Sequence, residues 1–178
     1  MTLLAATLMA APAFADESLV ARVACRGGAV NGAFELRSPD GRLRSSGAFA
    51  QGSKTGTFIF WTAGGARSAV IPYDRDARTG TVALWYTAGG RETAKKLEAP
   101  FSGGVINGVV RSYHADGSLR SEAVYERGAL VTAQALDVRG RPLADAQARQ
   151  RASRDMDANA KVLASFDALV GRYLPHCE

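Results

Sequence analysis

The side chains that most often carry catalysis or bind metals are few in this chain and far apart. Among its 178 residues, His114 and His176 are the only histidines, and Cys25 and Cys177 are the only cysteines. The sequence contains no H-x-x-x-H pair, no C-x-x-C pair and no phosphate-binding loop. No nucleophile can be placed beside a base from this pattern. We therefore predict a protein that is not an enzyme and that uses no metal or other cofactor.

The charged residues also indicate no specialised site. The net charge of +5 comes from 22 basic and 17 acidic residues, which are scattered singly rather than clustered. Scattered charge of this kind is typical of a solvated surface, whereas nucleic-acid binding needs a basic patch. We expect no nucleic-acid partner.

The first fifteen residues, MTLLAATLMAAPAFA, have the features of an export signal. An apolar core over positions 3–11 is followed by Pro12 and by Ala13-Phe14-Ala15, a small-x-small cleavage pattern. The segment is too short to span a bilayer as a helix of the mature protein. We predict a signal peptide at 1–15 and a periplasmic or secreted chain without a transmembrane segment. The alternative is an N-terminal helix that stays in the protein.

A repeated spacing of glycines organises the rest of the chain. The unit that begins at Gly32 has further glycines at 41, 52 and 56, and related units begin at Gly56, Gly80 and Gly108. Each unit contains a turn sequence, at 38–41, 62–65, 87–90 and 114–117, with a short strand on either side. Short connections on both sides make consecutive strands antiparallel neighbours. We predict a mainly β fold over residues 16–142, a single elongated antiparallel meander sheet of about nine strands built from hairpin repeats of ~24 residues.

The repeat pattern is G-x-[FVW]-x-x-[YW]-x-x-x-G, followed by an aromatic residue and G-x-x-x-G. Its clearest copies are GTFIFW from Gly56 and GVVRSYHADG from Gly108. This pattern resembles the MORN-repeat variant family over roughly residues 19–143. The resemblance implies an elongated, twisted sheet that mediates interactions and has no catalytic residues. Bacterial members of that family are often described as antitoxin-like, which supplies an alternative function.

The last segment, 143–178, has the composition of a helix with a short tail. The segment is rich in alanine, and it contains no glycine between residue 143 and Gly171. Pro175 is expected to stop the helix. Met156, Leu163 and Val170 repeat every seven residues on an apolar face, and the polar face carries Arg151, Arg154, Asp157, Lys161 and Asp167. A single sheet needs a cover on one face. We therefore expect this helix to pack back along the sheet, with a coiled-coil or membrane-surface helix as the alternative.

The lengths of the two elements predict a disulfide bond. A helix of about 31 residues spans ~46 Å, and nine strands extend ~38 Å across a sheet. A helix leaving the last strand can thus return to the first and bring Cys177 to Cys25, which occupies the repeat position of Phe49. An oxidising compartment permits the bond, and closing so long a loop contributes ~4–5 kcal/mol in the chain-entropy model. The alternatives are two free thiols or a disulfide bond from Cys177 to another subunit.

The face left uncovered by the helix is the candidate binding surface, and the length of the hairpin turns decides which face that is. A three-residue turn, which Pro39 favours, places Trp61, Trp85 and Tyr113 beneath the helix. The open face then carries the candidate residues Phe34, Phe58, Phe60, Leu84, Arg44 and Arg120, together with Val82. A two-residue turn exchanges the sets and leaves Trp61, Trp85 and Tyr113 open.

An open row of large apolar side chains beside arginines indicates a partner surface, although cross-strand stacking alone can account for single aromatic residues. We expect an exported interaction or scaffold module that binds a protein or an envelope component, either glycan or lipid. An antitoxin or immunity-type protein is the alternative, and a hydrolase of envelope polymers is a more distant one. The sequence indicates no oligomeric state.

Overall fold

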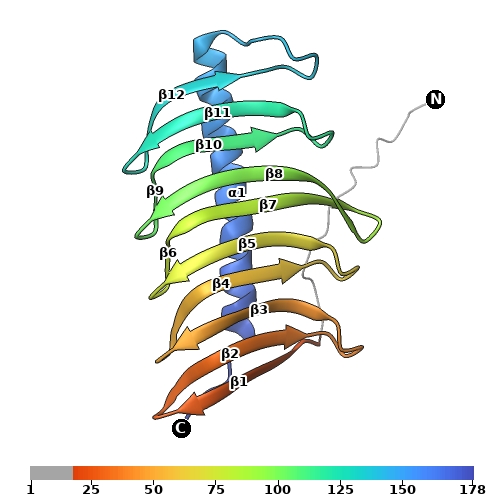
Figure 1. Ribbon diagram of the computed structural model, residues 1–178, viewed down its shortest axis with the longest axis vertical. Coiled ribbons are helices and arrows are strands. Elements are labelled where there is room, and N and C mark those ends of the chain that lie inside the picture. The colour runs from red at the N-terminus through yellow and green to blue at the C-terminus, as the bar shows by residue number, and fades with distance from the viewer. Residues whose placement is uncertain (1–17) are drawn as a thin grey trace, which may run out of the picture.

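A computed structural model describes residues 18–178, which form one antiparallel sheet and one long helix (Figure 1). The fold is therefore mainly β, as the repeat pattern predicts. The predicted signal peptide at 1–15 lies outside the described residues. The strands are β1 (Val20–Arg26), β2 (Ala29–Arg37), β3 (Leu43–Ala50), β4 (Ser53–Trp61), β5 (Arg67–Asp74), β6 (Ala77–Arg78), β7 (Gly80–Ala88), β8 (Arg91–Ser102), β9 (Val105–Ile106), β10 (Gly108–Tyr113), β11 (Leu119–Glu126) and β12 (Ala129–Ala135).

The strands pair in chain order, so the predicted meander is confirmed. The order across the sheet is β1-β2-β3-β4-β5-β7-β8-β10-β11-β12, and the short strands β6 and β9 pair with β5 and β8. The sheet has 12 strands in place of the roughly nine that we predicted. Two of the additional strands arise because the chain breaks briefly at Thr79 and Asn107, which separates β6 from β7 and β9 from β10.

Two prolines in the sheet explain these breaks. The carbonyl oxygens of Pro72 and Pro100 accept hydrogen bonds from the amides of Thr79 and Asn107, each at 3.0 Å. Because proline has no amide hydrogen, it cannot return a second ladder bond. The next residue, Gly108, has φ 122°, and a Cβ there would lie 2.9 Å from the Pro100 ring. The glycine that opens a repeat is thus required here by the close approach of a proline ring.

Helix α1 (Asp145–Tyr173) crosses the whole sheet on one face, from β12 to the neighbourhood of β1 (Figure 1). It confirms the expected docked helix. The helix ends at Tyr173, and its C-cap residue Leu174 directly precedes Pro175, which we predicted as a stop signal. The helix residues buried against the sheet are Ala148, Ala152, Asn159, Leu163, Phe166, Leu169 and Val170.

The core lies between α1 and the covered face of the sheet. Its centre is a group of phenylalanines in edge-to-face contact, with ring centroids 5.5 Å apart for Phe34 and Phe49 and 5.6 Å apart for Phe49 and Phe58. The ring of Phe60 packs on that of Phe166 from the helix at 4.5 Å. Aromatic pairs in these arrangements add about 0.5–1.5 kcal/mol each beyond the burial of their area. Aromatic packing thus links the helix directly to the repeats.

The predicted disulfide bond is formed between Cys25 on β1 and Cys177 beyond the helix. The two Cα atoms are 5.6 Å apart, and 152 positions separate the residues in sequence. The bond closes the loop that runs out along the sheet and back along the helix. It therefore joins the first strand to the last residues of the chain.

We predict that replacing both cysteines with serine lowers the free energy of unfolding by up to about 5 kcal/mol, because the bond restricts the unfolded chain. Urea unfolding of the oxidised protein and of the double variant measures the difference. The reduced native protein is the control and should match the variant. Equal stability of the oxidised and reduced forms would contradict the prediction.

Candidate functional site

The structure corrects the choice of open face. Phe34, Phe58, Phe60 and Leu84, which we placed on the open face, are at most 1 % exposed and lie beneath α1. Arg44 is fully buried. Arg120 also points to the helix, where its guanidinium forms two hydrogen bonds with Asp155, at 2.8 and 3.1 Å. These residues hold the helix in place, and substitutions such as Phe58→Ala would damage the core rather than probe a surface.

A recurrent β-bulge is the reason for this correction. The three-residue loop after Ser38 is present, and Ser38 pairs with Arg42 as expected for it. The pairing then shifts by one residue, from Arg37 opposite Leu43 to Leu36 opposite Ser45. One extra residue reverses the face of every side chain that follows it.

The same shift occurs in each of the four hairpins. At this shift the residues left without a partner in the ladder are Arg44, Ser68, Lys96 and Arg120, which all occupy the same position of the repeat; the third hairpin has a second shift, at Thr93. We call these four residues the bulge positions.

The open face of the sheet carries Trp61, Trp85 and Tyr113, the alternative set from the sequence. All three side chains are half-buried. Trp61 lies opposite Arg67 in the ladder, and Trp85 lies opposite Lys95. We call these five residues the aromatic–cation row. It runs across the strands from β4 to β10, a distance of about 20 Å at ordinary strand spacing.

The side chains of the aromatic–cation row support one another. The guanidinium carbon of Arg67 lies 4.1 Å from the centre of the Trp85 ring, and Glu92 accepts two hydrogen bonds from the same guanidinium, each 3.0 Å. The Tyr113 hydroxyl donates to Glu98 at 3.0 Å, and Lys95 forms an ion pair with Glu98. Hydrogen bonds from Lys95 lower the pKa of Glu98, although burial opposes them. Aromatic rings and paired charges therefore alternate along a fixed row.

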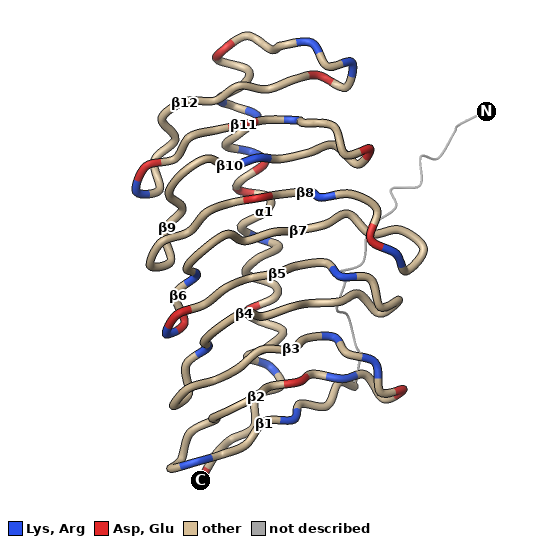
Figure 2. Tube along the Cα trace, viewed as in Figure 1, with Lys and Arg blue, Asp and Glu red and all other residues tan. Residues whose placement is uncertain are grey.

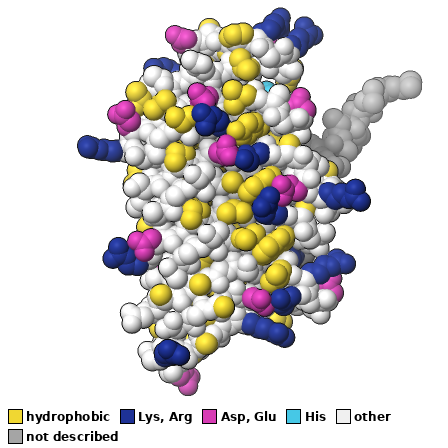
Figure 3. Space-filling model, in the orientation of Figure 1, with side chains coloured by type: hydrophobic (Ala, Val, Ile, Leu, Met, Phe, Trp, Pro, Cys, Tyr) yellow, Lys and Arg dark blue, Asp and Glu magenta, His cyan; other side chains and the backbone are white. Residues whose placement is uncertain are grey.

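Figure 3 views this face, and it shows hydrophobic side chains in an interrupted row with basic and acidic side chains beside them. Figure 2 shows that both signs of charge recur along the whole length of the sheet. Arg67 and Lys95 were not among the surface residues predicted from the sequence. Their position could have been found by pairing each strand across its turn, since Arg67 is the ladder partner of Trp61.

On the covered face of the sheet, Asp167 of α1 anchors the helix to three strands. It forms ion pairs with Lys54 of β4 and Arg78 of β6, and it accepts a hydrogen bond of 2.7 Å from the Tyr73 hydroxyl of β5. We had placed Asp167 on the solvated face of the helix, which is wrong. Burial, followed by the hydrogen bond to Asp167, raises the pKa of Tyr73 far above its usual value. Tyr73 therefore acts as a neutral hydrogen-bond donor.

The same contacts lower the pKa of Asp167. Burial alone would raise it, but the hydrogen bonds from Lys54 and Tyr73 and the charges of Lys54 and Arg78 outweigh burial. A carboxylate held by cations and hydroxyls in this way is a structural anchor that stays ionised.

The described residues offer no metal centre. No group of three or more histidine, cysteine or acidic side chains within residues 18–178 is arranged to hold a metal ion. His114 is half-buried beside a hairpin turn, whereas His176 is exposed near the end of the chain. In the same part of the chain, no helix is long and apolar enough to cross a membrane.

No protein-family model matches the sequence, and no curated protein matches it either.

We predict that Asp167→Asn lowers the free energy of unfolding by about 2 kcal/mol at pH 7, because Lys54 and Arg78 lose a partly buried partner. The lowered pKa gives the pH dependence. Stability from ionised Asp167 is fully present above the unfolded-state pKa of about 3.9 and is lost as the pH falls through the lower folded-state pKa. The difference between wild type and variant should therefore shrink below about pH 4.

Urea unfolding at pH 7, 5 and 3 measures this difference. Asp157→Asn is the matched control, because Asp157 is an exposed aspartate of the same helix. A variant that is as stable as wild type at pH 7, or a difference that grows in acid, would contradict the anchoring role.

Proposed function

We propose that this protein is an exported, non-enzymatic interaction module that binds a protein partner through the aromatic–cation row. The observation that carries the proposal is the difference between the two faces of the sheet. A long helix covers one face, while the other leaves two tryptophans and a tyrosine half-exposed in a line. If these aromatic residues only stabilised the sheet by cross-strand stacking, a continuous exposed row of them would not be required.

The residue types in the row are those that dominate protein interfaces. Tryptophan, tyrosine and arginine are enriched among residues whose truncation costs more than about 2 kcal/mol of binding energy. The cations of the row are preorganised, since Arg67 is held by Trp85 and Glu92 and Lys95 by Glu98. Little side-chain freedom is then lost on binding, which favours affinity.

The paired carboxylates make a phosphate backbone an unfavourable ligand, because they offset the positive charge of the row. Glycan stacking on the same aromatic rings is the other ligand chemistry that this surface supports. The disulfide bond supports an oxidising compartment, in keeping with a periplasmic or secreted protein. Membership of the MORN-repeat variant family is part of the proposal and is supported by the repeat pattern and the meander sheet.

We predict that the double variant Trp61→Ala/Tyr113→Ala binds its partner at least tenfold more weakly than wild type, as expected when interface anchors are truncated. Immobilised wild-type protein would first capture partners from an envelope extract. The affinity of the purified partner for each variant would then be measured by calorimetry. Lys161→Ala, at an exposed position of the helix, is the control and should bind as wild type.

Thermal unfolding of both variants tests whether they remain folded. Equal affinity of the double variant and wild type would contradict the proposed surface. Loss of binding in the helix variant alone would place the partner on the other face. Capture of glycan fragments, without any protein, would identify the stacking surface as a carbohydrate site.

A further inference from the structure

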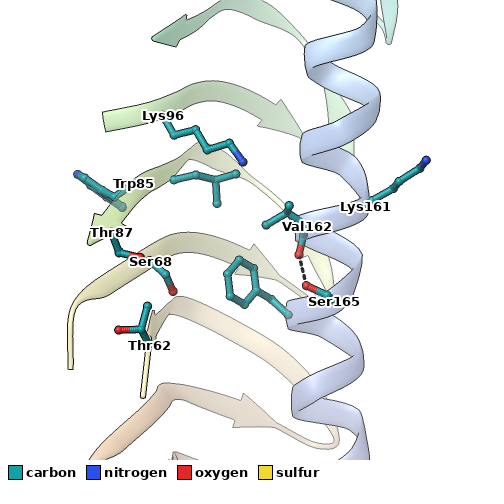
Figure 4. A pocket seen from close by; sticks show the side chains of 10 residues that line it. Thr62, Ser68, Trp85, Thr87, Lys96, Lys161, Val162 and Ser165 are labelled. Carbon is teal, nitrogen blue, oxygen red and sulfur yellow. Dashed lines mark hydrogen bonds between the residues drawn. The ribbon is translucent and has the colours of Figure 1, made fainter. Parts of the chain in front are cut away.

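A cavity of about 420 Å³ opens between α1 and the part of the sheet that lies nearest the turns at 62–65 and 87–90 (Figure 4). Its apolar wall is formed by Leu84 of β7 with Val162 and Phe166 of the helix. Trp85 also borders it, but the indole is directed away from the helix in Figure 4. The cavity therefore lies mainly on the covered side of the sheet, and Trp85 is the residue that it shares with the aromatic–cation row.

The bulge positions explain why there is space here. Arg44, Lys96 and Arg120 are long side chains that extend towards the helix, but the equivalent residue in the second hairpin is Ser68. Ser68 lines the cavity, and its hydroxyl donates to the Phe60 carbonyl oxygen at 3.2 Å. A short side chain at this one bulge position leaves unfilled the volume that an arginine or lysine would occupy.

A second, more polar cavity of about 230 Å³ adjoins the first along the helix. Lys96 lines both cavities, and Asn159 and Ser112 line the second. Asn159 is 3 % exposed, and its side-chain oxygen has no hydrogen-bond partner among the described residues. A buried amide oxygen without a partner is costly unless a donor satisfies it, and a bound water can supply that donor whereas a carboxylate cannot.

The charge at the junction of the two cavities is positive. Arg120 and Asp155 neutralise one another through two hydrogen bonds. Lys96 is half-buried, and no carboxylate within residues 18–178 forms an ion pair with its ammonium group. In Figure 4 the Lys96 side chain reaches towards the helix, whereas that of Lys161 is directed away from the cavity. Burial lowers the pKa of Lys96, and the charge of Asp155 opposes that effect.

We propose that the two cavities form one binding site for a single-chain anionic amphiphile of the fatty-acid type. The carboxylate would pair with Lys96 beside the polar cavity, and the alkyl chain would lie along Leu84, Val162 and Phe166. Charge complementarity at Lys96 selects the anionic head. The apolar lining of the larger cavity selects the tail. The site lies on the opposite side of the sheet from the proposed partner surface and is independent of it.

The test is calorimetric titration of the disulfide-bonded protein with sodium decanoate below its critical micelle concentration. Decanol and decyltrimethylammonium are the head-group controls, and hexanoate and octanoate vary the tail. Decanoate should bind at least tenfold more tightly than either control. Each added methylene should strengthen binding roughly three- to fourfold, the value for burying one such group.

Two variants locate the site. Lys96→Gln should weaken decanoate binding at least tenfold, the usual range for losing a hydrogen bond to a charged group, while leaving decanol binding unchanged. Lys95→Gln is the matched control because the neighbouring lysine is paired with Glu98 on the open face. Ser68→Leu should weaken binding of the tail by filling the cavity, and unfolding measurements would verify that each variant is folded.

No binding of decanoate would overturn the proposal. Equal affinities for decanoate, decanol and decyltrimethylammonium would also overturn it, since that result describes adsorption of an alkyl chain without recognition of the head. Equal loss in Lys95→Gln and Lys96→Gln would show a general charge effect rather than a site at Lys96.

Discussion

One extra residue in each hairpin determines what every side chain of the sheet contacts. The bulge at Arg44, Ser68, Lys96 and Arg120 shifts the ladder by one position, and a shift of one exchanges the two faces of a strand. Because of it, the apolar side chains of the first strand in each hairpin, among them Phe34, Phe58 and Val82, share a face with Phe49 and Tyr73 and form one core. The tryptophans are left on the other side. Core, partner surface and cavity all depend on this shift.

The helix is held on the covered face by polar contacts at both flanks of an apolar seam. Asp167 binds side chains from one end of the strands, and Asp155 binds Arg120 near the other. Apolar burial is non-directional, so the seam alone would allow the helix to slide or rotate. The two aspartates fix its position, and this fixed position creates the cavities beside Ser68 and Lys96.

Much of the architecture could be predicted from the sequence because glycine spacing and turn residues are local signals. The meander, the helix and the bond between Cys25 and Cys177 all follow from counting along the repeat. The face of the sheet that stays open could not be predicted, because the arginines, serine and lysine at the bulge positions share no chemical feature that indicates a bulge. The role of Asp167 was missed because its partners come from β4, β5 and β6, far away in sequence.

The link between Cys25 and Cys177 also affects the order of folding. Contacts within the sheet are between neighbouring strands, so hairpins can form as each repeat is completed, as in other repeat arrays. The helix packs along the covered face of the sheet, and Cys177 follows the helix in the chain. The covered face therefore stays exposed until α1 has been synthesised. The nascent sheet needs protection from aggregation throughout that interval.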